Sequence, residues 1–138
     1  MVVTPVRRSG AAVLIGAACG MRTFTGPAVL ALRGRMPGPA LLTAVAAGEA
    51  IGDKTAIVPA RTSAPALGAR MLSGALSGRA LGGAPGVVLG ALGALTVTFG
   101  AYRARAALTG LTGLPDPLLG VAEDAVAAAA AALATRIA

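Results

Sequence analysis

The chain has 138 residues, enough for one domain, but only 12% of them are charged, whereas a soluble domain of this size carries about a quarter. Hydrophobic residues make up 56% of the chain and the mean hydropathy is +0.80, which argues against a water-soluble core. The net charge of +7 comes from scattered arginines with only 2% aromatic residues, so no nucleic-acid partner is expected.

Cysteine and histidine counts restrict the chemistry further. Cys19 is the only cysteine and there is no histidine, which excludes an intramolecular disulfide and the usual zinc sites. No metal or cofactor is expected. Phosphate-loop, nucleophile-elbow and histidine-dyad patterns are missing, so we do not expect an enzyme. Ser73 and Ser77 each precede a glycine without a neighbouring base and are interpreted as small packing residues.

Five apolar segments are predicted to be helices, at residues 10–32, 38–52, 64–82, 85–108 and 117–137. Most begin with a proline in or next to the first turn, where its missing N–H costs nothing, and Ser63 and Asp116 are candidate N-caps. The first, fourth and fifth segments reach roughly 30 Å, the thickness of a bilayer's hydrocarbon core. The sequence therefore predicts an all-α fold, an integral membrane helical bundle of four to five segments forming one transmembrane domain, residues 1–138.

The first segment contains a charge and a helix breaker. Arg22 lies within an apolar run, where a lipid-facing charge is costly. Gly26-Pro27 removes an intrahelical hydrogen bond, so we expect the first helix to be broken near Gly26-Pro27 and the broken stretch to face the interior. Arg22 with the hydroxyls of Thr23 and Thr25 suits an anion such as phosphate or carboxylate. The alternative is that Arg22 pairs with an intramembrane acid.

The second segment is short, about 23 Å, and it ends in acids. Glu49 and Asp53 are four residues apart and share a helix face, with Lys54 directly after them. These carboxylates could hold a cation or relay a proton, or they could be solvated interfacial groups. Whether residues 38–52 span the membrane or re-enter it is left open, and the orientation of the protein depends on that choice.

Further charges lie in the later segments. Arg70 lies in the interior of the third segment, and Glu123 and Asp124 lie about two turns into the fifth. Neighbouring helix positions differ by about 100°, so at least one of these two acids is expected to face away from lipid and to pair with an arginine.

Two weaker patterns concern packing and duplication. Glycines four apart, as at Gly16/Gly20 and Gly74/Gly78, permit close helix approach in a tight bundle or a homo-oligomer. Residues 10–54 and 85–127 share a faint echo in which a long apolar span is followed by a proline-led helix with acids. This echo suggests a diverged repeat of two helical units.

These motifs resemble a family of small bacterial integral membrane proteins catalogued as domain of unknown function 4126. The matching stretches are Gly20-Met21-Arg22-Thr23-Phe24 followed by Pro27, then Glu49 to Lys54, then Glu123-Asp124. Ala56 replaces a proline common in that family, and Gly26 lengthens the approach to Pro27. The resemblance implies a multi-pass protein of the bacterial inner (plasma) membrane and no established catalytic residues.

The favoured function is a channel, transporter or binding protein for a small ion or anionic solute, with the lipid bilayer and other copies of the chain as expected partners. The candidate ligand-binding residues are the charged and hydroxyl groups named above: Arg22, Thr23, Thr25, Glu49, Asp53, Lys54, Arg70, Glu123 and Asp124. The competing expectation is a structural or accessory membrane subunit without transport activity. An enzyme acting on lipid phosphate head groups is the third hypothesis, and it would require a carboxylate base.

Overall fold

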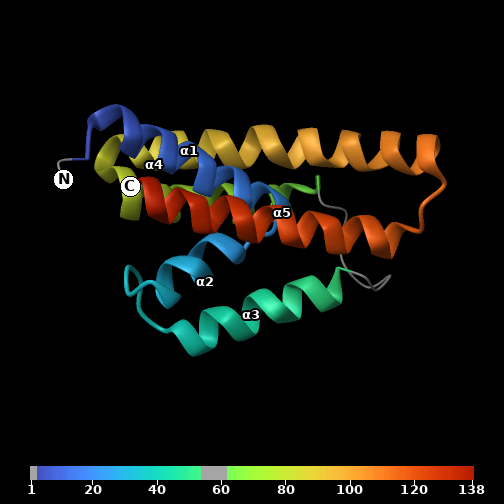
Figure 1. The fold of residues 1–138 in the computed structure, drawn as a ribbon, viewed down its shortest axis with the longest axis horizontal. Coiled ribbons are helices and arrows are strands. Elements are labelled where there is room, and N and C mark those ends of the chain that lie inside the picture. The colour runs from blue at the N-terminus through green and yellow to red at the C-terminus, as the bar shows by residue number, and fades with distance from the viewer. Residues whose placement is uncertain (1–2, 54–61) are drawn as a thin grey trace.

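The structure is a computed structural model that describes residues 3–53 and 62–138. Within these ranges it is all-α, without strands (Figure 1): α1 (Pro5–Met21), α2 (Thr25–Leu32), α3 (Pro39–Gly52), α4 (Ala64–Thr112) and α5 (Asp116–Ile137). The predicted all-α class is confirmed. Asp116 is the first residue of α5 and Pro115 takes the N-cap position, so the predicted Asp116 cap is wrong.

The long helix α4 is a hairpin of two helices. Gly83 has φ 66° and ψ −147°, a backbone conformation nearly confined to glycine. The chain reverses there, and residues 64–82 run back along residues 84–112 (Figure 1). Pro85 lies in the first turn of the second half, where it costs no hydrogen bond. The two halves correspond to the predicted segments 64–82 and 85–108.

Glycines allow three helix backbones to touch at the centre of the bundle. A Cβ added at Gly90 would overlap the carbonyl oxygen of Gly74, and one added at Gly16 would overlap that of Gly90. One added at Gly20 would lie 2.5 Å from the carbonyl oxygen of Ala94. Because only hydrogen fits in these gaps, the glycines at these positions allow α1 to pack against the second half of α4, and the two halves of α4 to pack against each other.

The predicted break in the first segment occurs at residues 22–24, slightly earlier than Gly26-Pro27. Pro27 lies in the first turn of α2, a position where proline is tolerated, so the helix is broken before this proline and not at it. After the break α2 turns back toward the end of the molecule that holds both termini (Figure 1). Leu30 of α2 is fully buried in the same core cluster as Ile15 of α1.

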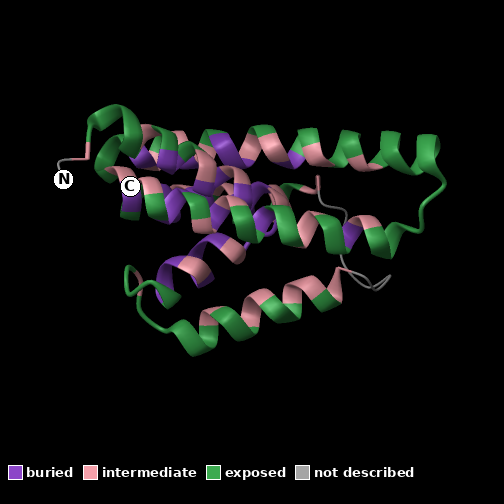
Figure 2. Cartoon of the chain, in the orientation of Figure 1, coloured by how far each residue is buried: buried purple, intermediate pink, exposed green. Residues whose placement is uncertain are grey.

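α3 lies apart from the helices that form the core, next to α2 (Figure 1). It is the helix without a buried residue among those described, and Figure 2 shows it only in the colours of intermediate and exposed residues. Leu41 and Ile51 are each 69% exposed. In contrast, α4 and α5 are long and apolar enough to cross a membrane, with mean hydropathies of 1.7 and 1.5 over their most apolar stretches.

Candidate functional site

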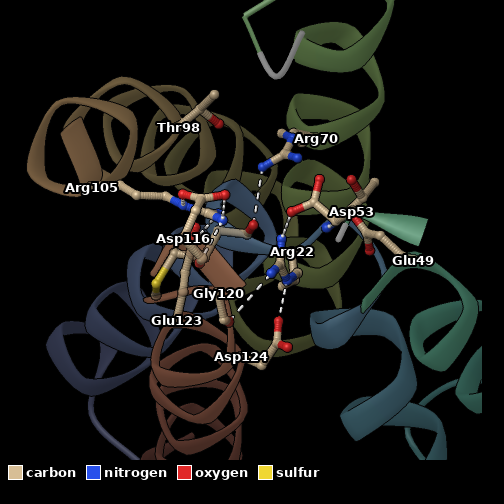
Figure 3. Close-up of polar contacts among 12 residues, drawn as sticks. Arg22, Glu49, Asp53, Arg70, Thr98, Arg105, Asp116, Gly120, Glu123 and Asp124 are labelled. Atoms are coloured by element: carbon tan, nitrogen blue, oxygen red, sulfur yellow. Dashed lines mark hydrogen bonds and ion pairs between the residues drawn. The ribbon is translucent and has the colours of Figure 1, made fainter. Parts of the chain in front are cut away.

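The helix break is the centre of a charged cluster (Figure 3). Arg22 follows the last residue of α1 and is 2% exposed. Its Nη1 donates to Oδ2 of Asp53, which directly follows α3, and its Nε donates to Oδ1 of Asp124 on α5. Its Nη2 lies 3.4 Å from the carbonyl oxygen of Gly120. One guanidinium therefore joins three helices that are distant in sequence, which is the fork geometry that only arginine provides.

The N-terminus of α2 carries a carboxylate. The backbone N–H of Thr23 donates to Oε1 of Glu49 at 2.7 Å, and that of Phe24 donates to Oε2 at 2.9 Å. The first N–H groups of a helix have no intrahelical acceptor, and the helix dipole favours negative charge there. Glu49 supplies both the hydrogen-bond acceptors and the negative charge. A side chain of α3 therefore occupies the anion-binding end of α2.

The C-terminus of α1 carries a cation in the same way. Nη1 of Arg70, on the first half of α4, donates to the carbonyl oxygens of Gly20 at 2.6 Å and of Met21 at 3.1 Å. The hydroxyl of Thr98 also donates to the Gly20 oxygen, at 3.1 Å. Since the last carbonyls of a helix lack partners, these donors stabilise the end of α1 inside the bundle.

A second set of ion pairs lies between the second half of α4 and α5. Arg105 donates from Nε and Nη2 to the two carboxylate oxygens of Asp116, each at 2.7 Å, and from Nη1 to Oε2 of Glu123 at 3.3 Å. Asp116 is 65% exposed, whereas Glu123 is 10% exposed. All five acids of the sequence therefore contact an arginine or the N-terminus of α2.

The predicted site residues contribute to the cluster in different ways. Thr23 participates through its backbone: its N–H binds Glu49 and its carbonyl oxygen accepts a hydrogen bond from the Ser73 hydroxyl. Thr25 begins α2, and its hydroxyl makes no hydrogen bond with the described residues. Glu123 pairs with Arg105, on the second half of α4. Lys54 lies outside the described residues.

Sequence reasoning missed two hydroxyl groups. Ser73 was expected to be a packing residue, yet it is buried and its hydroxyl bonds the broken backbone at Thr23. Thr98 belongs to none of the sequence motifs, although its hydroxyl bonds the end of α1 at Gly20. The available signal was periodicity, because Arg70 and Ser73 are three residues apart and so share one face of α4. From the sequence we interpreted the neighbouring Gly74 as a packing residue but did not group the hydrogen-bond donors Arg70 and Ser73 on one face.

An apolar groove of about 500 Å³ lies beside this cluster, between the second half of α4 and α5. Met21 lines it where α1 ends, and Arg105 and Glu123 are its charged lining residues. The lining of this groove is otherwise mostly apolar. Within the described ranges, no group of three cysteine, aspartate or glutamate side chains is placed to hold a metal ion.

Comparison with protein-family models, with curated proteins and with solved structures finds no match to this chain. The resemblance to domain of unknown function 4126 therefore stays a prediction from its short motifs.

Proposed function

We propose that this chain is a multi-pass membrane protein that binds and moves a small ion at the broken helix around Arg22. A single observation carries the proposal: two helix ends, one bearing carbonyls and one bearing N–H groups, meet beside a buried arginine in an apolar bundle. Non-helical backbone inside a membrane is tolerated where it faces protein or a polar path, and transporters place ion and substrate sites at such interruptions.

The depth of the break supports this proposal. Gly20 packs on Ala94 and accepts a hydrogen bond from Thr98, so the break lies level with the middle of residues 84–112. Those residues rise about 43 Å, enough to cross a bilayer. If α4 spans the membrane, Arg22 lies near its midplane, where a charge is costly and therefore marks a structural or transport role.

The partners of Arg22 favour an anionic solute. Two carboxylates from separate elements, Asp53 and Asp124, contact its guanidinium. An incoming carboxylate or inorganic anion could replace one of them by a like-for-like exchange, which leaves the arginine paired at every stage. Such an exchange keeps the guanidinium paired, and the displaced carboxylate avoids the cost of a buried charge by taking up a proton or by reaching water.

The test is flux of small anions, with chloride, phosphate and acetate as probes, into liposomes containing purified protein. We expect wild-type flux, and loss of at least tenfold in Arg22→Gln and in Glu49→Gln. Arg79→Gln, which removes an exposed arginine of α4, is the matched control and is expected to keep wild-type flux. Absence of wild-type flux for every probe would overturn the proposal. Only folded fractions of equal helicity and size are compared.

A second function is favoured by a different observation, namely that the described contacts already engage both Nη groups and the Nε of Arg22. A cluster satisfied in this way suits an accessory or structural membrane subunit, in which ion pairs determine helix register. In that case Arg22→Gln and Glu49→Gln would reduce assembly or thermal stability, and no probe would cross the membrane.

A further inference from the structure

We propose that α3 is a lid, fastened over the helix break by Glu49 and Asp53, that swings away from the bundle when these carboxylates lose their partners. The use of this lid as a gate rests on the proposed function, but its attachment and release are argued from the structure alone.

Apolar packing contributes little to holding α3 in place. None of its residues is buried, whereas Leu30 on the much shorter α2 is fully buried. The half-buried positions of α3 include Leu42, Val45 and Ala46, which lie on one helix face, and α2 is the helix that α3 packs against. Leu41, at the edge of that face, and Ile51, on the opposite side of the helix, are exposed. Since van der Waals packing between helices grows with the number of buried contacts, in water or in lipid, this one-sided contact with α2 is a weak attachment.

Charged contacts hold the C-terminal end of α3. Glu49 receives the N–H groups of Thr23 and Phe24, and Asp53 pairs with Arg22. Asp53 is 10% exposed, so its ion pair is screened less than a surface pair. These are charge-assisted hydrogen bonds, which are about twice as strong as neutral ones. These two contacts are made by residues four apart in the chain, Glu49 and Asp53, and both lie at the helix break.

The opposite end of α3 has the form of a hinge. Gly34 and Gly38 have φ values of 70° and 73° and lie in the turn between α2 and α3. Few residue types adopt this left-handed backbone without strain, and glycines of this kind can absorb the dihedral changes of a hinge. With a hinge at one end and a charged attachment at the other, α3 can pivot about the turn once the attachment is lost.

Other charged groups face this attachment from neighbouring elements. Asp124 approaches Arg22 from α5, and Arg70 binds the end of α1 from the first half of α4 (Figure 3). Arg22 therefore keeps Asp124 as a partner when Asp53 leaves. An anion that takes the place of Asp53 would release one fastening while keeping Arg22 neutralised, which couples anion binding to lid opening.

The experiment measures the distance between the C-terminal end of α3 and α5 by double electron–electron resonance, using spin labels at Ile51→Cys, which is exposed, and Leu133→Cys in a Cys19→Ala background. We expect one narrow distance in the parent and a distribution that is broader and longer, by roughly one helix diameter of 10 Å, in Glu49→Gln/Asp53→Asn. Asp116→Asn, which neutralises an exposed acid of the other ion-pair set, is the matched control and is expected to keep the parent distance.

A reference pair of labels at Val13→Cys and Leu133→Cys reports whether α1 and α5 stay packed. An unchanged α3–α5 distance in the double variant, with this reference intact, would overturn the lid. Loss of the reference distance identifies an unfolded sample. In that case the α3–α5 distance is measured in the single variants Glu49→Gln and Asp53→Asn, and the same two outcomes apply to them. Lid opening without wild-type anion flux would overturn the proposed function but support the lid. Anion flux with an α3 that does not move would support the proposed function but overturn the lid.

Discussion

At the scale of single residues, Arg22 illustrates why a buried charge is informative only together with its partners. The sequence placed it within an apolar run and left two hypotheses open, an anion site or an intramembrane ion pair. In the structure its guanidinium contacts the carboxylates of Asp53 and Asp124. The ion pair is present, and an anion site is now a proposal that requires exchange with one of these carboxylates.

Replacing Arg22 should be strongly destabilising. Arg22→Gln leaves Asp53 and Asp124 without their shared counter-ion, and breaking a buried pair on one side costs about 3–5 kcal/mol. Arg22→Lys should cost less, because it keeps the charge but cannot reproduce the guanidinium fork. Equilibrium unfolding in mixed micelles measures both. Arg22→Gln with wild-type stability would contradict the observed ion pairs.

At the scale of helices, local sequence signals and packing agree closely. Prolines and glycines in the sequence mark both the start of α3 at Pro39 and the division of α4 at Gly83. The path of α2, in contrast, does not follow from any proline or glycine in the sequence. Its reversal depends on the capping of both broken ends by Glu49 and Arg70, which come from other helices. A single-sequence pattern has no access to such nonlocal partners.

Glycines that look alike in sequence should respond oppositely to alanine. At Gly90 a Cβ would overlap the backbone of Gly74, so Gly90→Ala should force the halves of α4 apart at a cost of about 1–3 kcal/mol or more. At Gly110, also in α4, nothing lies within 4 Å, and the better helix propensity of alanine should stabilise by up to about 1 kcal/mol. Thermal unfolding of both variants checks this. Equal effects would contradict the observed packing.

The two turns flanking the second half of α4 make different demands on glycine. Gly113 has φ 65° and ψ 11°, a left-handed conformation that asparagine tolerates, so Gly113→Asn should change stability little. Gly83, with ψ −147°, lies in a region almost restricted to glycine, and Gly83→Asn should cost about 1–3 kcal/mol. The difference in unfolding free energy between the two variants is the measurement. A cost at Gly113 equal to that at Gly83 would be inconsistent with these dihedral angles.

At the scale of the whole molecule, the reversal at the break gathers positive charge at one end. That end carries both termini (Figure 1), and Arg35 reaches the backbone of Ala138 there. It holds most of the arginines of the described chain: Arg7, Arg8, Arg33, Arg35, Arg79 and Arg136. The opposite part of the bundle, where Arg105 lines the groove, holds Arg103 and Arg105. Sequence alone left the orientation open because it could not decide whether residues 38–52 span the membrane or re-enter it.

This distribution predicts the topology. If the chain spans a bacterial inner membrane as proposed, the positive-inside rule predicts that the end with both termini is cytoplasmic and that the turn at Gly113 faces the other side. A fluorescent-protein fusion at the C-terminus should therefore fluoresce, and alkaline phosphatase inserted at Gly113 should be active in a bacterial host. An active phosphatase at the C-terminus together with an inactive one at Gly113 would reverse the orientation.

The sequence by itself determined the helical class, the approximate bounds of the helices and the identity of the charged residues, because hydrophobic runs, prolines and glycines act locally. Only the tertiary structure decided which charges meet, where the first helix reverses and that α3 stays outside the core. Those features depend on pairings such as Arg22 with Asp124 and Glu49 with Thr23, which join residues far apart in the chain. A local sequence pattern shows that burying such charges is unfavourable, and only the fold shows which ion pairs and hydrogen bonds compensate for it.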